Sequence, residues 1–366
     1  MKQGVTVNFA LMGCGRIAQR YAALLAGGEV SGGRLVAVCD PQGDRAELLA
    51  QKVGLPFFKD LNAMMSGYGG LIDVVCVLTE SGHHARDVLN VVQKYVKHVV
   101  VEKPMALTLS DADQMIAQCD QKGVKLFVVK QNRLNLPVQK LREAFSEGRF
   151  GKLVMGSVKV RWHRDQSYYD QDDWRGTWAL DGGVFANQAS HHIDLLEWFF
   201  GEPVSVFAKS STSLVDIEVE DTGAAIIKFK SGAICVVEAT TAARPNDIEG
   251  SLTILGEKGN VEIGGFAVNK ILRWEFSEPM KEDDEILRNF SENPPDVYGF
   301  GHKAYLENVV KAISLGGASL VDGLEGRKSL ELISAIYESI ETGREIALRF
   351  SPSKCKLGVL RSDSSL

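Results

Sequence analysis

The stretch that most constrains the fold of this chain of 366 residues runs from Val5 to Arg20. It begins with apolar residues, 5–12, that first alternate and then run continuously, as is typical of a buried β-strand. Gly13, Cys14 and Gly15 follow directly and lead into residues that favour a helix. Gly13 permits a tight turn, and Gly15 lets a phosphate approach the backbone. The stretch therefore predicts a strand, a turn and a helix whose N-terminus can bind an anion.

The next predicted strand, 34–39, ends in an acid, Asp40. A βαβ unit that binds a dinucleotide places a carboxylate here, against the ribose hydroxyls. An ordinary βαβ turn is the alternative, since glycine-rich turns are common. With strand, turn, helix, strand and acid in register, we interpret this region as a Rossmann unit that prefers NAD(H). The predicted cofactor contacts within it are Gly13, Gly15, Arg16, Ile17 and Asp40.

The rest of the chain falls into two parts that differ in their pattern of predicted strands and helices. Strands and helices alternate up to residue 129, which predicts a doubly wound parallel sheet. Beyond 131, strand-like runs joined by short turns predict a large, mostly antiparallel open sheet, with helices at 188–200, 302–315 and 326–342. We therefore predict an α/β protein with a Rossmann domain at 1–130, an α+β domain for substrate binding and oligomerisation at 131–350, and a frayed tail at 351–366. The final helix is expected to return to the first domain.

Composition narrows the class of protein. Lys and Arg number 41 against 47 Asp and Glu, a net charge of −6 without a long basic run, which argues against nucleic-acid or anionic membrane partners. No apolar run is long enough to span a bilayer. The six cysteines show no CxxC spacing, as expected for free thiols in a reducing, cytoplasmic compartment. HExxH and HxxxH strings are also absent, so no metal site is predicted.

Lys103 is the first candidate for chemistry. It follows the predicted strand 98–101, between Glu102 and Pro104, and ligands on open parallel sheets bind at the carboxyl ends of the strands. A lysine there can donate to a substrate hydroxyl and stabilise alkoxide charge as a hydride leaves. The alternative is a surface lysine that packs only its aliphatic stem.

His191 is the second candidate. In the predicted helix 188–200 it shares a face with Asn187 and Asp194, which are spaced by four and three residues. Such a histidine can act as a general base for a hydroxyl proton, although a structural histidine is the alternative. Asn187 is neutral and cannot take the proton itself, so that role falls to His191.

The glycine turn, the Glu102-Lys103-Pro104 string and the helix carrying His191, Ile193 and Asp194 together resemble the Gfo/Idh/MocA oxidoreductases. The resemblance extends from Val5 to about Leu348. It implies NAD(H) as cofactor, Lys103 at the substrate hydroxyl and His191 as the acid/base. It also implies cofactor contacts from Thr79 and His84, in a loop that departs from the family pattern at Glu80 and Ser81, and from Glu102, Lys103 and Gln131.

Finer features are similar to the branch that oxidises the 3-hydroxyl of UDP-N-acetylglucosaminuronate. These features are Asn187, where many members have Asp, the 131–133 segment and the segment around Trp174. The resemblance implies a carbohydrate substrate, with inositol, polyol and aldose dehydrogenases as alternatives. An NAD-dependent glycosidase and a non-catalytic NAD-binding sensor on the same fold also stay open.

The segment 159–169 is rich in cationic and aromatic residues, which suit phosphate or carboxylate oxygens and a uracil ring. Arg161, Arg164 and Arg133 are therefore predicted to bind substrate, together with Trp174, Asn187 and His191. A solvated strand face is the alternative for the cationic residues. Apolar residues such as Val158, Val160, Val206, Ile226 and Val236 are expected on an exposed sheet face, which predicts a homodimer or homotetramer.

Overall fold

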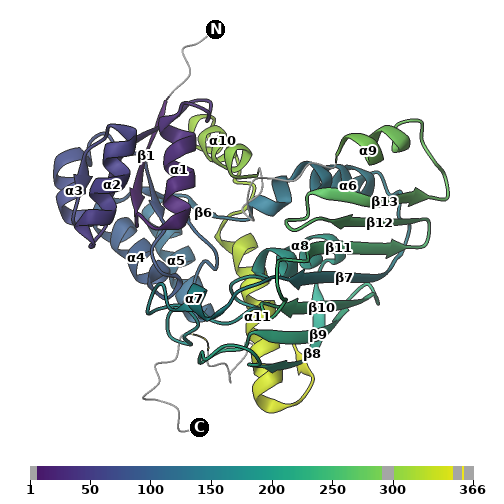
Figure 1. The fold of residues 1–366 in the computed structure, drawn as a ribbon. Coiled ribbons are helices and arrows are strands. Elements are labelled where there is room, and N and C mark those ends of the chain that lie inside the picture. The colour runs from purple at the N-terminus through teal and green to yellow at the C-terminus, as the bar shows by residue number, and fades with distance from the viewer. Residues whose placement is uncertain (1–5, 291–300, 349–356, 358–366) are drawn as a thin grey trace. The chain divides into compact units, whose positions relative to one another are not determined.

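The computed structural model describes residues 6–290, 301–348 and 357. The chain divides into two compact units (Figure 1), the first formed by 1–129 and 302–327 and the second by 130–301 and 328–366. The predicted domain limits differ from these units, because 302–327 belong to the first unit. The backbone N–H of Val128 donates to Val321 (3.1 Å), and a Cβ at Gly326 would lie 2.6 Å from the Val128 side chain. The predicted tail lies outside the described residues except for Leu357, which is buried.

Unit 1 contains a six-stranded sheet in the order β3-β2-β1-β4-β5-β6, and all its pairs are parallel. This is the strand order of a dinucleotide-binding sheet, whose connections reverse direction between β1 and β4. The parallel doubly wound sheet predicted from the sequence is confirmed. Its strands are β1 (Val7–Met12), β2 (Gly33–Cys39), β3 (Phe57–Phe58), β4 (Val74–Val77), β5 (His98–Val101) and β6 (Leu126–Val128).

The helices of unit 1 connect these strands. Thr108 caps α5: its hydroxyl accepts from the Asp111 N–H (3.1 Å) and donates to the Asp111 carboxylate (2.7 Å), a standard way to satisfy a helix start. The helices are α1 (Arg16–Ala26), α2 (Gly43–Val53), α3 (Leu61–Tyr68), η1 (Ser81–His83, a 3₁₀ turn), α4 (His84–Tyr95), α5 (Leu109–Lys122) and α10 (Gly301–Ser314), of which 302–314 lie in this unit.

Unit 2 is built on an eight-stranded sheet in the order β13-β12-β11-β7-β10-β9-β8-β14. Its pairs are antiparallel except β7 with β10, so the mostly antiparallel sheet is confirmed. The strands are β7 (Leu153–Arg161), β8 (Pro203–Ser211), β9 (Thr222–Phe229), β10 (Ile234–Thr240), β11 (Glu249–Gly256), β12 (Gly259–Gly264), β13 (Lys270–Phe276) and β14 (Ile346–Ala347). The helices are η2 (Gln131–Leu134, a 3₁₀ turn), α6 (Leu136–Ser146), α7 (Gln166–Tyr169), α8 (Ser190–Phe200), α9 (Asp283–Asn289) and α11 (Gly323–Thr342), of which 328–342 lie in this unit.

The two faces of this sheet differ in burial. Val158, Val160 and Val206 were expected on an exposed face, but they are fully buried because they alternate onto the inner side of the sheet, where α8 packs on β7. Ile226 does lie on the open face, where its side chain is 55% exposed, and Val236 is half-buried. The open face is thus apolar in part, with a residue set that differs from the predicted one.

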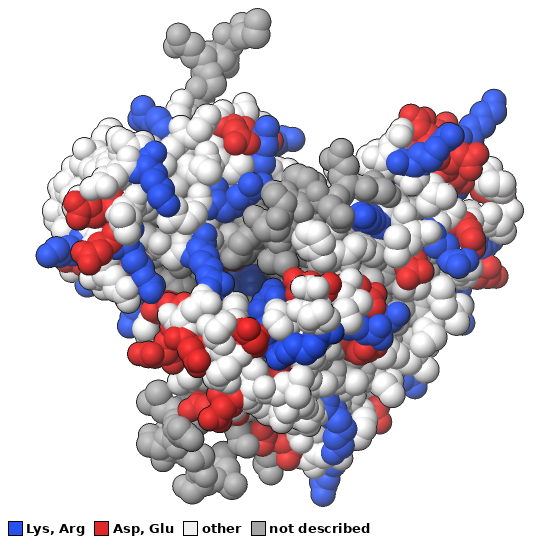
Figure 2. Space-filling model, in the orientation of Figure 1, with Lys and Arg blue, Asp and Glu red and all other residues white. Residues whose placement is uncertain are grey.

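The surface carries both signs of charge. On the face shown in Figure 2, Lys and Arg are interspersed with Asp and Glu, in line with the net charge of −6. None of the described helices combines the length and the apolar character that crossing a bilayer requires.

Candidate active site

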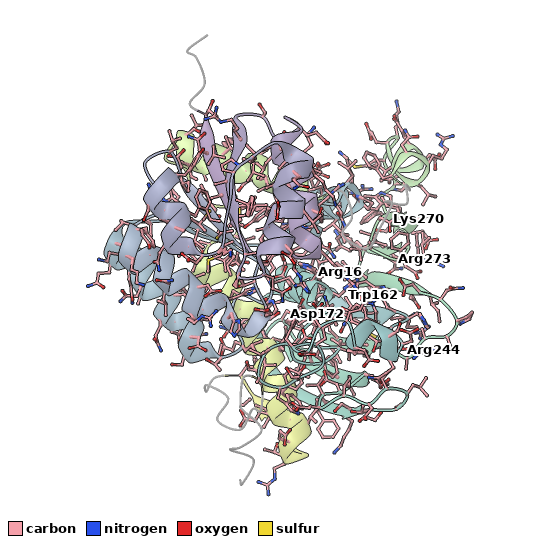
Figure 3. All side chains as sticks on the ribbon, turned by 60° about the vertical axis from the view of Figure 1, so that its left-hand side comes forward. Arg16, Trp162, Asp172, Arg244, Lys270 and Arg273 are labelled. Atoms are coloured by element: carbon pink, nitrogen blue, oxygen red, sulfur yellow. The ribbon has the colours of Figure 1, made fainter. Side chains whose placement is uncertain are left out.

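The glycine turn of unit 1 is built to approach a ligand. Gly13 has φ +95°, and a Cβ there would lie 2.6 Å from the Leu78 carbonyl oxygen, so only glycine fits between the ends of β1 and β4. Gly15 differs, since a Cβ there would meet nothing within 4 Å. Gly15 is the N-cap of α1, which begins at Arg16 (Figure 3) and continues with Ile17, without a side-chain cap or an acid in its first turn. The first backbone N–H groups of α1 therefore suit a pyrophosphate, the group that the sequence predicted here.

Asp40 lies directly after β2 with its carboxylate held by two backbone donors. Oδ2 accepts from the Cys14 N–H and Oδ1 from the Gln42 N–H, both at 2.7 Å. Each carboxylate oxygen can accept a further hydrogen bond. The group is thus pre-oriented beside the glycine turn, as an acceptor for ribose hydroxyls must be.

Thr79 and His84 join two strand ends of unit 1. The Thr79 hydroxyl donates to Asp87 (2.8 Å), while the ring nitrogens of His84 face the carbonyl oxygens of Pro104 (2.7 Å) and Thr79 (3.0 Å). Burial lowers the pKa of His84, against the two backbone hydrogen bonds. The imidazole of His84 thus holds the loops after β4 and β5 together, and its predicted contact with the cofactor stays a prediction.

Glu102 anchors the end of β5. Its carboxylate accepts from the Tyr21 hydroxyl and from the Lys103 N–H, both at 3.0 Å, and lies 3.8 Å from His302 Nε2. Burial by itself would raise the pKa of Glu102, but the hydrogen bonds and charges of His302 and Lys103 outweigh it and hold the pKa below its usual value. Lys103 is half-buried, and the following peptide bond to Pro104 is cis. A negative charge fixed in the protein therefore lies beside the backbone of the candidate catalytic lysine.

His191 in unit 2 is paired with Gln131. His191 lies in the first turn of α8 and is 9% exposed, and its Nε2 lies 2.9 Å from Nε2 of Gln131 at the start of η2. The amide of Gln131 thus lies against the candidate acid/base, and its predicted contact with the cofactor stays a prediction.

Asn187 lies in the turn before α8, whereas the sequence predicted that it shares a helical face with His191. Because α8 begins at Ser190, Asn187 is in the preceding turn and does not share a helical face with His191. Its amide donates to Asp181 (2.5 Å). The same turn is held by Glu220, whose Oε1 accepts from the Phe185 N–H (3.1 Å). Asn187 is therefore positioned by backbone and carboxylate contacts that no local pattern reveals.

Asp194 and Arg133 form a buried ion pair. Arg133 donates from Nε to Oδ2 (2.7 Å) and from Nη2 to Oδ1 (2.9 Å), and its guanidinium stacks on Trp198 at 5.0 Å. Lys130 reaches the same carboxylate at 3.5 Å and Ser329 at 2.6 Å. Burial would raise the pKa of Asp194, but Arg133 and Lys130 hold it below its usual range. Arg133, expected to bind the anionic end of a substrate, instead joins η2 to α8, and Lys130 was not predicted from the sequence.

Arg161 also differs from its expected role. On the open sheet face it donates to Glu238 (2.6 and 2.8 Å) and to Glu249 (3.0 Å), its neighbours on β10 and β11. The hydrogen bonds from Arg161 lower the pKa of Glu238. The guanidinium is thus committed to a cross-strand ion network.

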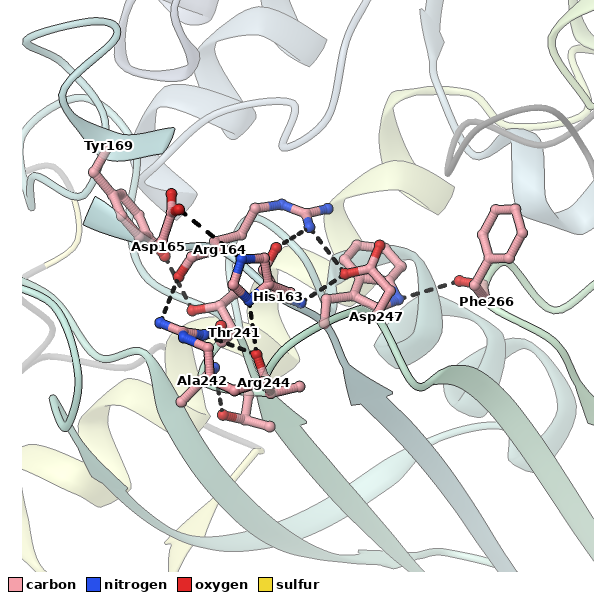
Figure 4. Close-up of polar contacts among 12 residues, drawn as sticks. His163, Arg164, Asp165, Tyr169, Thr241, Ala242, Arg244, Asp247 and Phe266 are labelled. Carbon is pink, nitrogen blue, oxygen red and sulfur yellow. Dashed lines mark hydrogen bonds and ion pairs between the residues drawn. The ribbon is translucent and has the colours of Figure 1, made fainter. Parts of the chain in front are cut away.

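Arg164 lies in a polar cluster just after β7 (Figure 4). Its Nη1 donates to the His163 carbonyl and to Asp247 (3.1 Å), and the guanidinium lies over the rings of Trp162 (5.5 Å) and Tyr168 (5.3 Å). Another guanidinium, that of Arg175, lies over the Trp174 ring, 4.6 Å from the ring centroid. Arg164 thus lies among aromatic rings, with Asp247 as a carboxylate partner.

Comparisons with known proteins agree with this architecture. Residues 7–130 match the oxidoreductase family with an NAD-binding Rossmann fold, and 138–262 match the GFO/IDH/MocA C-terminal domain. The WlbA dehydrogenase of Bordetella pertussis, solved in complex with NADH and UDP-GlcNAcA, is 40% identical with a TM-score of 0.87, over 94% of this chain and 98% of that one. The Chromobacterium violaceum WlbA, solved with the same ligands, is 41% identical with a TM-score of 0.86, over 94% and 96%.

A curated relative extends the comparison to polyols. The myo-inositol 2-dehydrogenase of Thermotoga maritima is 28% identical over 349 residues, which are 93% of this chain and 98% of that protein. The six-stranded parallel sheet of unit 1 lies within the residues that match the NAD-binding family. The chain therefore belongs to the Gfo/Idh/MocA family of NAD-dependent oxidoreductases.

Proposed function

We propose that this protein is a nucleotide-sugar dehydrogenase that oxidises the 3-hydroxyl of UDP-N-acetylglucosaminuronate. The observation that carries the proposal is the identity of 40% and 41%, over 94% of the chain, with two WlbA dehydrogenases solved with UDP-GlcNAcA. The polyol relative reaches 28%.

For this reaction the chain supplies a hydrogen-bond donor, Lys103, and a general base, His191. When bound, NAD⁺ accepts the hydride that leaves the sugar carbon. Lys103 donates a hydrogen bond to the substrate hydroxyl and stabilises its developing negative charge. His191 takes the hydroxyl proton as general base, and the neutral amide of Asn187 hydrogen-bonds the sugar. Gly15, Arg16 and Asp40 hold the cofactor through its pyrophosphate and ribose.

The anionic and aromatic parts of the substrate require a different set of side chains. We assign Arg164 and Trp174 to them, because arginine matches phosphate or carboxylate oxygens and indole rings stack on bases. Arg161 serves as a control, because it lies on the open face of the sheet, where Glu238 and Glu249 on β10 and β11 bind its guanidinium.

Turnover on a panel of substrates tests the proposal. UDP-N-acetylglucosaminuronate should be oxidised orders of magnitude faster than the free uronic acid, glucose or myo-inositol. Arg164→Ala should reduce this preference, whereas Arg161→Ala should leave it nearly unchanged. Equal or faster oxidation of a free sugar or of inositol would refute the nucleotide-sugar assignment and favour a polyol dehydrogenase. Release of a leaving group without net NADH would indicate a glycosidase, and no turnover on any compound would indicate a sensor.

The open face of the unit 2 sheet supports a homodimer or a larger homo-oligomer. Phe207, Ile226 and Val236 are register neighbours across β8, β9 and β10, and Ile234 pairs with Met155 on β7. Four of them are more than a third exposed (Phe207 37%, Ile226 55%, Ile234 48% and Met155 42%). A contiguous apolar patch of this kind usually marks association between protein surfaces.

A further inference from the structure

The contact between Gln131 and His191 is buried on both sides. Gln131 is 3% exposed and His191 9%, and the two Nε2 atoms are 2.9 Å apart. Gln131 Oε1 has no hydrogen-bond partner among the described residues. Burying an amide oxygen without a hydrogen bond destabilises the folded protein. The location of this amide beside the candidate base therefore suggests a role in the chemistry.

An amide is suited to a partner that changes its protonation state. Its NH₂ group donates to a bare imidazole nitrogen, and after rotation about the terminal torsion its oxygen accepts from a protonated one. A carboxylate would favour the imidazolium, and an apolar side chain would bond neither form. Glutamine therefore keeps one hydrogen bond to Nε2 before and after a proton transfer.

The backbone on both sides of this contact is clamped. Arg133, two residues after Gln131, binds Asp194, which lies three residues after His191. Both side chains of this ion pair are 3% exposed, and removing one partner of such a pair leaves the other charge buried without compensation. The ion pair therefore fixes η2 against α8 and with it the distance between Gln131 and His191.

The other charged groups around this contact are placed as follows. Helix α8 packs on η2, β7 and β11. Arg133 lies on η2, Asp194 and Glu197 lie on α8, and Lys130 directly precedes η2. The charged residues of β7 and β11 that alternate away from the α8 side are Lys159, Arg161 and Glu249.

We infer that Gln131 is the positioning residue of His191, which keeps the imidazole in one place while it gains and loses the substrate proton. The inference rests on the proposed function for the role of His191 as acid/base. It assigns Gln131 to the base rather than to the cofactor.

A histidine titration by NMR tests the contact without any substrate. Ring signals of the ¹⁵N-histidine-labelled full chain are followed against pH, and His191 is assigned by the signal that His191→Gln removes. Gln131→Glu should raise the midpoint of the His191 titration by about one to three pH units, the effect of an opposite charge at this distance. Gln118→Glu, the same exchange on α5 of unit 1, should leave the midpoint unchanged. The circular dichroism spectrum and the thermal unfolding midpoint confirm that each variant is folded.

Kinetics of the same variants test the positioning role. In Gln131→Glu, the acid limb of the pH profile of kcat/KM for sugar oxidation should shift to higher pH by the same amount as the NMR midpoint. Gln131→Met, which removes the hydrogen bond without adding charge, should lower kcat about a hundred-fold with little change in KM, because a misplaced base slows the chemical step. A midpoint unchanged in a folded Gln131→Glu, or full activity in Gln131→Met, would overturn the inference. If the wild-type protein oxidises no sugar nucleotide, the proposed function fails, and the NMR titration still decides whether Gln131 controls His191.

Discussion

Replacement of Glu220 by glutamine should change how the stability of the protein depends on pH. Burial raises the pKa of Glu220 from 4.5 to about 7, against hydrogen bonds from the Phe185 N–H (3.1 Å) and the Tyr337 hydroxyl (2.9 Å). Oε2 has no partner among the described residues, and a Cβ on Gly183 would lie 2.1 Å from it. This carboxyl packs tightly against the turn that leads into α8.

The size and the sign of this pH dependence follow from the difference between the pKa values of Glu220 in the folded and the unfolded state. Between pH 4.5 and about 7 the folded protein keeps this proton while the unfolded chain releases it, so stability falls as the pH rises. At about 1.4 kcal/mol per pKa unit, the shift costs the folded state on the order of 3 kcal/mol above pH 7. A neutral glutamine loses nothing over this range. The stability of Glu220→Gln relative to wild type should therefore rise by up to about 3 kcal/mol from pH 4.5 to 8.

Urea unfolding followed by tryptophan fluorescence, from pH 4.5 to 8.5 at constant ionic strength, measures this difference. Glu238→Gln, on β10 of the same unit, is the control. Hydrogen bonds from Arg161 lower the pKa of Glu238, so its contribution to stability is present above the unfolded pKa and is lost as the pH falls. Wild type and Glu220→Gln curves that run parallel over the whole range would refute the reasoning about Glu220.

The remaining predictions concern cofactor, chemistry and assembly. Asp40→Ser should shift the cofactor preference toward NADP(H), because Asp40 repels a 2′-phosphate; titration of the wild type that shows NADP(H) bound as tightly as NAD(H) would contradict this role. His191→Ala and Lys103→Ala should each lower turnover about a hundred- to ten-thousand-fold with NAD binding retained, and near-normal rates in either would remove that residue from the mechanism. Light scattering should show a homo-oligomer that Ile226→Lys weakens, whereas a wild-type monomer at micromolar concentrations would contradict the assigned interface.

The parts of the fold that depend on local pattern were predictable from the sequence. The bounds of β5 coincide with the predicted strand 98–101, because this is a run of apolar residues that ends in charge. The glycine turn and the position of Asp40 were likewise predictable, since their roles depend on backbone freedom and on position after a strand.

The parts that depend on distant partners were not predictable. Arg133 looks like a free cation in the sequence, but its partner Asp194 is 61 positions away. Asn187 appears to continue the α8 helix, yet Asp181 holds its side chain in a turn before the helix starts. Such pairings are set by tertiary packing, which spacing along the chain does not reveal.

The central claim is that this protein removes a hydride from a nucleotide-linked sugar. A single-turnover experiment with UDP-N-acetylglucosaminuronate deuterated at C3 and NAD⁺ tests it most directly, because mass spectrometry of the quenched mixture detects cofactor that stays bound. We expect one deuterium in the reduced nicotinamide. The sugar product should be the intact UDP-linked 3-keto sugar, two mass units lighter than the unlabelled substrate. Reduced nicotinamide without deuterium, or no reduction while myo-inositol is oxidised, would contradict it.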